Sequence, residues 1–339
     1  MTQRSICVTG AAGFVGSHII RQLLAAGSCV RGTVRNPDDR TKRAHLDKLA
    51  DAYPGQLEVI GADLLRPGSF EQAMSGCVGL IHTATAVLVT ASDPQRAIVD
   101  VAVEGTKNVL HTAAKCTDIK SVVMTSSISA IMSFGRPQGT TFSEADWCDS
   151  ADLRVDPYGH AKALSEKQLW IFADAHKDRV RVTSINPGYI LGPALAAHHV
   201  DGSLSTLRDL VQRNYPACPR MLFWLADVRD VATAHLRALD RPAADGQRII
   251  VADTRKWLQE IAQVLSSKHK VPLRNLPDFV AMLAAIFDRR LSFGYMRAFV
   301  GYDYNLALDR AKTILDLEYR DANASILETA ATMIEHDWI

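Results

Sequence analysis

The sequence lacks a long apolar run, a strong excess of charge of either sign and a closely spaced pair of cysteines. A helix that spans a membrane needs roughly 20 consecutive apolar residues, so no membrane span is expected. The 38 lysines and arginines nearly balance the 37 aspartates and glutamates, which leaves a net charge of +1. This charge provides no electrostatic basis for binding nucleic acid or an anionic membrane surface.

The six cysteines are scattered along the chain, and none belongs to a CxxC motif. Such spacing is typical of reduced thiols, so we expect a cytoplasmic protein without a zinc site. His198 and His199 have no further ligands at the spacing that a metal site requires, and no metal is expected there. The first strand is expected to begin near Ser5, so no signal peptide is expected. The cysteines are Cys7, Cys29, Cys77, Cys116, Cys148 and Cys218.

What the sequence does contain is enough apolar material for a full core, since 47% of its residues are hydrophobic and 22% are charged. Short apolar runs alternate with amphipathic stretches through the first two-thirds of the 339 residues. This alternation predicts an α/β fold of the Rossmann type, a doubly wound parallel sheet with helices on both faces. Strands are expected at Ile6–Thr9, Cys29–Val34, Leu57–Gly61, Gly79–His82, Ser121–Ser126 and Val180–Ile185. Helices are expected at Phe14–Ala26, Thr41–Ala52, Ser69–Met74, Pro94–Lys115 and Pro157–His176.

The rhythm changes after Pro193, where the segments become helical and are interrupted by prolines. One strand-like segment remains, at Arg248–Ala252. We therefore divide the chain into a dinucleotide-binding domain, residues 1–194, and a smaller, mostly helical substrate lobe, residues 195–339. Some segments of the second part are expected to return to the main sheet.

The segment TGAAGFVG (residues 9–16) joins the first strand to the first helix. Gly10 permits a tight turn, Gly13 lets the backbone approach a pyrophosphate, and Gly16 lets the helix pack closely on the sheet. The N–H groups of the helix start, at Phe14 and Val15, would then bind the phosphates. The alternative is that these glycines serve tight packing only.

The end of the second strand is where the ribose of an adenosine would lie. Proteins that bind NAD place an acidic residue here, which accepts a hydrogen bond from the ribose 2′-hydroxyl. This chain has Arg35 instead, with no acid before Asp38, and Lys42 follows within the next helix. A guanidinium suits a 2′-phosphate, which favours NADP(H) over NAD(H). The alternative is that both cations are ordinary solvated surface residues.

Further cofactor contacts are expected where the third and fourth strands end, because ligands of such sheets lie at the carboxyl ends of the strands. His82 closes the fourth strand, and we interpret it as a structural histidine rather than a catalyst. The expected contacts are Asp63 and Leu64 after the third strand, and Thr83, Ala84 and Thr85 after the fourth.

The segment YGHAK places Tyr158 and Lys162 four residues apart, on one face of a predicted helix. A tyrosine with a pKa near 10 is a poor acid–base catalyst at neutral pH, and a nearby cation lowers that pKa. Ser127 follows the fifth strand, so its hydroxyl would open onto the same crevice and orient a carbonyl. The alternatives are that YxxxK is a chance pattern and that Ser127 only caps a helix.

These motifs, together with Asn186-Pro187-Gly188 and the segment DVRDVA (residues 227–232), resemble the extended short-chain dehydrogenase/reductases. Within them the chain is similar to the dihydroflavonol reductase-like branch, which includes aldehyde and ketone reductases and cinnamoyl-CoA reductases. The resemblance implies a catalytic triad of Ser127, Tyr158 and Lys162, with Tyr158 as proton donor and Lys162 also on the nicotinamide ribose. It implies that Arg35 and Lys42 bind the 2′-phosphate, and that Pro187, Gly188 and Ile190 lie along the nicotinamide.

The chain departs from this branch at two positions. Met132 stands where dihydroflavonol reductases carry an asparagine that holds the flavonoid, which favours a more apolar carbonyl substrate. Ala102 stands where many relatives have the asparagine of a proton relay, which leaves that relay unassigned. Candidate pocket residues, for which core packing is an equal alternative, are Met132, Phe134, Tyr189, Trp224 and the stretch Phe293 to Tyr304.

The combined features predict an NADPH-dependent reductase of aldehydes or ketones, with a hydrophobic or aromatic small-molecule substrate and a monomeric or homodimeric state. One alternative is an NAD-dependent nucleotide-sugar epimerase or a hydroxysteroid dehydrogenase of the same superfamily. Another, of a different class, is a non-catalytic NADP(H)-sensing protein, because a fold by itself does not determine function.

Overall fold

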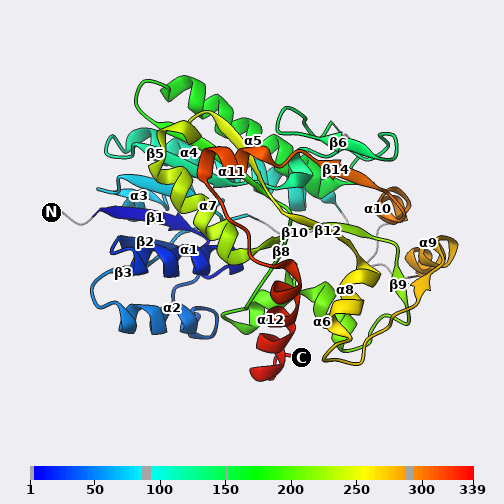
Figure 1. Cartoon of the computed structure of the whole chain (residues 1–339). Helices are drawn as coiled ribbons and strands as arrows, with labels where there is room; N and C mark the ends of the chain where they lie inside the picture. Colours follow the sequence, from blue (N-terminus) through cyan, green and yellow to red (C-terminus); the bar gives the residue numbers. More distant parts are fainter. Residues whose placement is uncertain (1–3, 86–92, 150–151, 288–292) are drawn as a thin grey trace.

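The computed structural model describes residues 4–85, 93–149, 152–287 and 293–339. At its centre lies one parallel sheet of seven strands in the order β11-β7-β5-β4-β1-β2-β3 (Figure 1). The order reverses direction at β1, which is the arrangement of a doubly wound sheet and confirms the predicted fold class. The strands are β1 (Ser5–Thr9), β2 (Cys29–Val34), β3 (Leu57–Gly61), β4 (Gly79–His82), β5 (Ser121–Thr125), β7 (Arg181–Pro187) and β11 (Gln247–Val251).

Helices cover both faces of this sheet because its strands are apolar on both sides. Ile6 and Val8 of β1 point into one core layer and Cys7 into the other, as the two-residue period of a strand requires. The first layer lies under α1 (Phe14–Ala25), α2 (Arg40–Ala52), α7 (Val228–Asp240) and α11 (Asp309–Leu315). The second lies under α3 (Glu71–Met74), α4 (Val101–Lys115) and α5 (Pro157–His176).

A second core belongs to the smaller lobe, and it is built around a three-stranded sheet in the order β12-β10-β8. Its strands are β8 (Tyr189–Leu191), β10 (Leu222–Asp227) and β12 (Thr254–Trp257). The helices are α6 (Ser205–Val211), α8 (Leu258–Leu265), α9 (Asp278–Phe287), α10 (Phe293–Phe299) and α12 (Ala322–Glu335). Two-stranded pairs join β6 (Thr140–Phe142) to β14 (Tyr304–Leu306), and β9 (Cys218–Pro219) to β13 (Asn275–Leu276).

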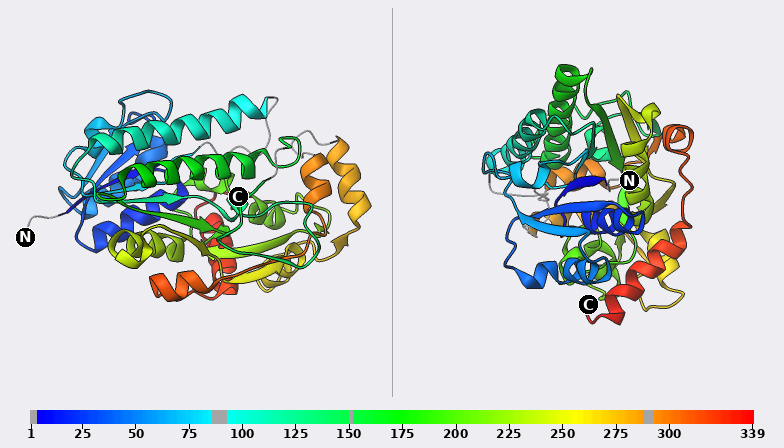
Figure 2. Two further views of the ribbon diagram at one scale, coloured as in Figure 1. Left: turned by 90° about the horizontal axis from the view of Figure 1, so that it is seen from above. Right: turned by 90° about the vertical axis from the view of Figure 1, so that its left-hand side faces the viewer.

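Figure 2 shows α9 and α10 at the end of the molecule opposite the N-terminus, with α4 and α5 side by side along the sheet. In the part of the chain that the structure describes, the remaining short helical segments are a π-helix at Gln95–Asp100 and 3₁₀ turns at Ile128–Ala130, Ala197–Asp201 and Pro242–Ala244. Among the residues described, no helix has both the length and the apolar character to cross a membrane.

The chain beyond residue 194 does not stay within one lobe. α7 packs on α1, and β11 pairs in parallel with β7 at the edge of the main sheet. The expected return of later segments to the main sheet is therefore observed, while the division at residue 194 stays a prediction. The sequence analysis expected only one strand after Pro193, so it missed the short strands β9, β12, β13 and β14 and the longest of the missed strands, β10 (Leu222–Asp227). All six residues of this strand are buried, so the run has no polar alternation to reveal it.

Candidate functional site

The glycine turn after β1 has the geometry of a phosphate cradle. Gly10 has a φ of +70°, and a Cβ there would lie 2.9 Å from the nitrogen of Ala84. A Cβ at Gly16 would overlap the carbonyl oxygen of Gly10. Helix α1 can therefore pack this closely on the glycine turn only with glycine at position 16. Gly13 caps α1 without a side chain, and the N–H groups of the first helical turn have no acceptor within the helix. Such N–H groups attract an anion.

The residues that follow β4 are hydrogen-bonded to Thr9, directly before this turn. The Thr83 hydroxyl donates to the Thr9 carbonyl oxygen at 2.7 Å, and the Ala84 N–H donates to the Thr9 hydroxyl at 3.2 Å. Thr85 follows, partly exposed. His82 is buried, with Nδ1 2.7 Å from the Thr9 hydroxyl oxygen. Burial, and secondarily the charge of Lys162, lowers the pKa of His82 to about 3, which keeps it neutral.

The adenosine end of the crevice carries two exposed cations. Arg35 directly follows β2, and Lys42 lies in the first turn of α2 with its Nζ 3.8 Å from Oδ2 of Asp39. After β3, the Asp63 carboxylate accepts the Leu65 N–H at 2.8 Å, which shapes the turn. Leu64 lies against α4, where a Cβ at Gly105 would lie 3.0 Å from the Cβ of Leu64.

Ser127, Tyr158 and Lys162 come together at the carboxyl end of β5. Ser127 follows that strand, and its hydroxyl is hydrogen-bonded to the Tyr158 hydroxyl. The Lys162 Nζ lies 5.8 Å from the centre of the Tyr158 ring and donates to the Thr125 carbonyl oxygen at 3.4 Å. Asp156 caps α5 by accepting the Gly159 N–H at 2.8 Å, which sets where the helix begins.

Burial shifts the pKa values of the phenol and the ammonium apart. It raises the pKa of Tyr158 to about 12, although the hydrogen bond from Ser127 counteracts the shift, and the Asp156 carboxylate adds to it. Burial also lowers the pKa of Lys162 to about 8, against the attraction of Glu166. At neutral pH the phenol therefore holds its proton and can donate it, next to a largely protonated lysine.

Sequence reasoning missed a buried carboxylate beneath this group. Glu166 accepts hydrogen bonds from the Ser126 hydroxyl at 2.5 Å and from the Asn186 amide at 2.8 Å. The same amide group donates to the Ser127 carbonyl oxygen at 3.0 Å. Arg248 completes the network, with Nε 2.5 Å from Oε1 of Glu166. The available signal was the four-residue spacing from Lys162 to Glu166, which puts both on one helix face.

Arg248 also holds the loop that leads toward α5. Its guanidinium donates to the carbonyl oxygens of Glu144 at 2.9 Å and Asp146 at 2.5 Å. The guanidinium lies 3.7 Å from the centre of the Trp147 ring, a cation–π contact. Through Arg248, strand β11 therefore supports both the loop and the Glu166 network.

The expected nicotinamide segment crosses from the main sheet to the smaller lobe. Pro187 ends β7, and a Cβ at Gly188 would overlap the Trp224 carbonyl oxygen of β10, so only glycine permits this crossing. Ile190 lies in β8, which follows Gly188 directly. Ala102, at the position without the relay asparagine, is buried in an apolar cluster with Ala161 of α5.

The aromatic pocket candidates share one apolar cluster. Met132, Phe134, Tyr189 and Trp224 all belong to or pack against the core of the smaller lobe. The Phe134 ring lies 5.8 Å from that of Phe299, and the Tyr302 ring lies 5.7 Å from that of Tyr304. The side chains of Phe293 and Tyr295 lie outside the part that the structure describes.

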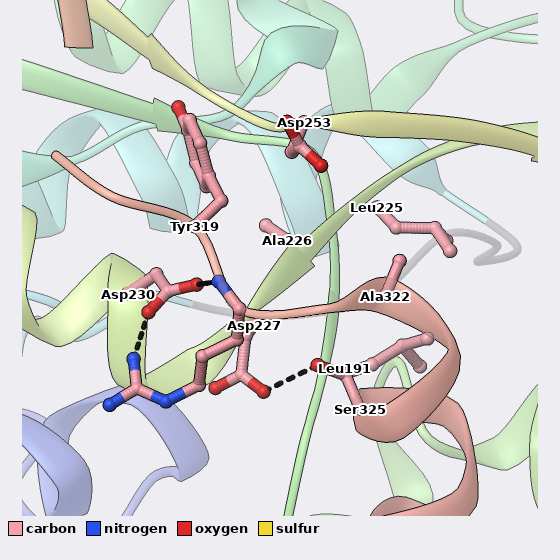
Figure 3. Close-up of a pocket in the computed structure, with 10 residues that line it drawn as sticks. Leu191, Leu225, Ala226, Asp227, Asp230, Asp253, Tyr319, Ala322 and Ser325 are labelled. Carbon is pink, nitrogen blue, oxygen red and sulfur yellow. Dashed lines mark hydrogen bonds and ion pairs between the residues drawn. The ribbon is translucent and has the colours of Figure 1, made fainter. Parts of the chain in front are cut away.

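A cavity of about 10 Å³ lies beside the segment that leads into α12, and Figure 3 shows the residues that line it. Burial acts to raise the pKa of Asp227, but hydrogen bonds from Arg229 and Ser325 outweigh it and lower the pKa. Asp230 pairs with Arg320. These bonds fasten the segment that leads into α12 to the start of α7, so the segment DVRDVA holds the two lobes together.

The side chains of His198 and His199 form hydrogen bonds within the protein, not the ligand set of a metal site. Both rings point at the glycine turn, with Nε2 atoms 2.7 Å and 3.0 Å from the Ala12 carbonyl oxygen. Among the described residues, no three His, Cys, Asp or Glu side chains group as a metal ion would require. The six cysteines form no disulfide.

The fold defines the class of protein: a Rossmann-type dinucleotide-binding protein with an added lobe. A family model described as the NAD dependent epimerase/dehydratase family matches residues 6–252. The chain therefore belongs to that family, and the resemblance to the extended short-chain dehydrogenase/reductases is confirmed.

Relatives lie in the branch that the motifs resembled. Cinnamoyl-CoA reductase CAD2 of Medicago truncatula is 32% identical over 337 residues, which cover 97% of this chain and 95% of that protein. Dihydroflavonol 4-reductase of Gerbera hybrida is 31% identical over 78% of this chain and 72% of that protein. The crystal structure of yeast methylglyoxal/isovaleraldehyde reductase Gre2 complexed with NADPH has a TM-score of 0.80 at 24% identity, covering 99% of this chain and 100% of that one.

Proposed function

We propose that this protein is an NADP(H)-dependent oxidoreductase that reduces aldehydes or ketones to alcohols, reversibly. The observation that carries the proposal is the meeting of Ser127, Tyr158 and Lys162 at the carboxyl end of β5, on the same sheet edge as the glycine turn. A proton donor, a hydroxyl and a cation beside a dinucleotide site are the groups that carbonyl reduction requires.

NADP(H) fits the residues along this edge. The turn can adopt its close-packed shape only with glycine at positions 10 and 16, because a Cβ at either would overlap neighbouring protein atoms. The start of α1 supplies N–H groups for the pyrophosphate. Arg35 and Lys42 would hold the 2′-phosphate. The remaining contacts would be Phe14 and Val15 at the pyrophosphate, Asp63, Leu64, Thr83, Ala84 and Thr85 along the adenosine and ribose, and Pro187, Gly188 and Ile190 along the nicotinamide.

In the mechanism, the cofactor when bound supplies the hydride. Tyr158 gives the proton of its hydroxyl to the carbonyl oxygen as negative charge develops there. The Ser127 hydroxyl donates a hydrogen bond to the same oxygen and orients it. Lys162 stabilises the phenolate that results, and in alcohol oxidation the same groups act in reverse.

The substrate is a small, apolar or aromatic carbonyl compound. Met132 offers no hydrogen bond to a polyhydroxylated ring, and the cluster of Phe134, Tyr189 and Phe299 is apolar. Relatives include cinnamoyl-CoA reductases and dihydroflavonol 4-reductase. The protein acts in the cytoplasm as a monomer or homodimer on a small-molecule substrate, without a nucleic-acid or membrane partner.

The test is NADPH and NADH consumption by the purified protein with a panel of aliphatic, aromatic and keto-ester carbonyls. Turnover with NADPH on aromatic members supports the proposal. Tyr158→Phe should abolish turnover but retain NADPH binding, while a non-catalytic sensor would be indifferent to the change. Copurified NAD without turnover of any carbonyl would point to an epimerase instead.

A further inference from the structure

The peptide between Ala12 and Gly13, in the middle of the glycine turn, is held at both ends. The Gly13 N–H donates to the Gly10 carbonyl oxygen at 2.9 Å. On the other side, the Ala12 carbonyl oxygen lies 2.7 Å from Nε2 of His198 and 3.0 Å from Nε2 of His199. A carbonyl oxygen can only accept, so both rings donate their Nε2–H groups, and both lone pairs of that oxygen are used.

The tautomer of His199 is determined from both sides. Its Nδ1 accepts the N–H of Leu195 at 3.2 Å, so the proton of the neutral ring must be on Nε2, where Ala12 needs it. The side chain is 3% exposed, and burial lowers its pKa to about 3, so the ring keeps this tautomer throughout the physiological range. A buried ring with both nitrogens satisfied has a single orientation.

The neighbouring carbonyls of the turn are held in the same way. The Ser17 hydroxyl lies 2.7 Å from the Gly13 carbonyl oxygen and 3.0 Å from that of Ala11. Nε2 of His45 lies 2.8 Å from the Ser17 hydroxyl oxygen, and the His45 ring centre lies 5.2 Å from that of His199. The carbonyls of residues 11 to 13 therefore have partners among these side chains.

We infer that His198 and His199 are positioning residues for the binding of the cofactor pyrophosphate. They hold the Ala12–Gly13 peptide in the orientation that keeps its carbonyl away from the phosphates. A flipped peptide would direct a carbonyl dipole at the anion and oppose the N–H groups of α1. The inference rests on the proposed function, because it takes the anion to be NADP(H).

The two histidines come from the 3₁₀ turn Ala197–Asp201, which follows β8 and precedes α6 in the smaller lobe. They lie 186 and 187 residues from Ala12 in the sequence. The glycine turn therefore relies on a segment of the substrate lobe for its shape. Sequence motifs confined to residues 9–16 cannot show this dependence.

The experiment compares two ligands with His198→Phe, His199→Phe and the double variant. NADPH reaches both the pyrophosphate and the 2′-phosphate regions, whereas adenosine 2′-monophosphate has no pyrophosphate. The double variant should raise the Kd for NADPH about tenfold or more, as expected when two hydrogen bonds to one carbonyl are lost. The Kd for adenosine 2′-monophosphate should change less than twofold, and kcat at saturating NADPH should be retained.

Two further variants separate positioning from folding. His198→Gln, whose amide can replace the Nε2–H donor, should recover most of the NADPH affinity that His198→Phe loses. His111→Phe, on the exposed side of α4, is the matched control and should leave both Kd values unchanged. Thermal unfolding of each variant verifies that it is folded at the assay temperature.

The remaining outcomes distinguish a failure of this inference from a failure of the proposed function. Unchanged NADPH affinity in the folded double variant, or parallel losses for both ligands, overturns the inference. Failure of the wild-type protein to bind either NADPH or adenosine 2′-monophosphate instead overturns the proposed function, because it removes the cofactor itself.

Discussion

Arg248 and Glu166 form a buried ion pair beneath the Ser127–Tyr158–Lys162 group, with Nε 2.5 Å from Oε1 and side chains 8% and 0% exposed. The pair joins β11 to α5 across 82 residues of sequence. Ser126 and Asn186 supply further hydrogen bonds to the carboxylate. An ion pair this deep is costly to break, because the partner that remains is a buried and uncompensated charge.

We therefore expect Glu166→Gln to lower the free energy of unfolding by about 3–5 kcal/mol. The matched control is Glu104→Gln, which breaks the exposed Lys107–Glu104 pair and should cost less than about 1 kcal/mol. Urea unfolding of both variants measures the difference. In the double variant Glu166→Gln/Arg248→Met, part of the loss should be recovered. Equal losses at the two sites would show that Glu166 has no special role.

The pH profile of reduction should break near the pKa of Lys162, which burial lowers to about 8. Below that pH the lysine is charged and Tyr158, whose pKa burial raises to about 12, is protonated, so kcat/KM for NADPH should be flat. Above it the cation is lost, and kcat/KM should fall with rising pH. Because Glu166 raises the pKa of Lys162, the break should move to lower pH in Glu166→Gln. A break that stays in place would contradict this coupling.

Asp156 makes stability depend on pH in the opposite sense from most carboxylates. Burial raises its pKa to about 6 in the folded protein, above the value of about 3.9 in an unfolded chain. The folded state therefore binds the proton more tightly, and this group's contribution to stability falls as pH rises from about 4 to about 6, by about 2–3 kcal/mol.

Asp156→Asn should remove that fall, because asparagine caps a helix well and carries no charge. Relative to wild type, the variant should gain stability between pH 4 and pH 7, which urea unfolding at both pH values measures. It should also lower the pKa of Tyr158, since the carboxylate raises it, and so shift alcohol oxidation to lower pH. A stability difference that is constant with pH would contradict the prediction.

Cofactor preference should depend mainly on Arg35. Arg35→Ala should raise KM for NADPH by about 10–100-fold, the range expected for charge-assisted hydrogen bonds to a phosphate, with little change for NADH. Lys42→Ala should have a smaller effect, because Asp39 lies 3.8 Å from its Nζ and offsets part of its charge. Arg40→Ala, also exposed in the first turn of α2, is the control. Steady-state kinetics with both cofactors test this, and a strong preference for NADH in the wild type would refute the assigned role of Arg35.

The amino-acid pattern was sufficient to predict the local elements of the fold. The expected strands Cys29–Val34, Leu57–Gly61 and Gly79–His82 match β2, β3 and β4, because each is a short, largely apolar run between turns. Helix α5 also begins and ends where expected. The relation of Tyr158 to Lys162 is equally local, since a four-residue spacing on a helix places both on one face.

Contacts between residues far apart in the chain could not be predicted, because they depend on how whole elements pack. Glu166 pairs with Arg248, and His199 contacts Ala12, only because the strand order and the path of the smaller lobe bring them together. β10 was missed for a related reason: the burial of both its faces comes from its partners, and its apolar run does not distinguish a strand from other buried segments. Periodicity reports the environment of neighbouring residues, whereas a contact across more than 80 residues depends on how whole elements pack.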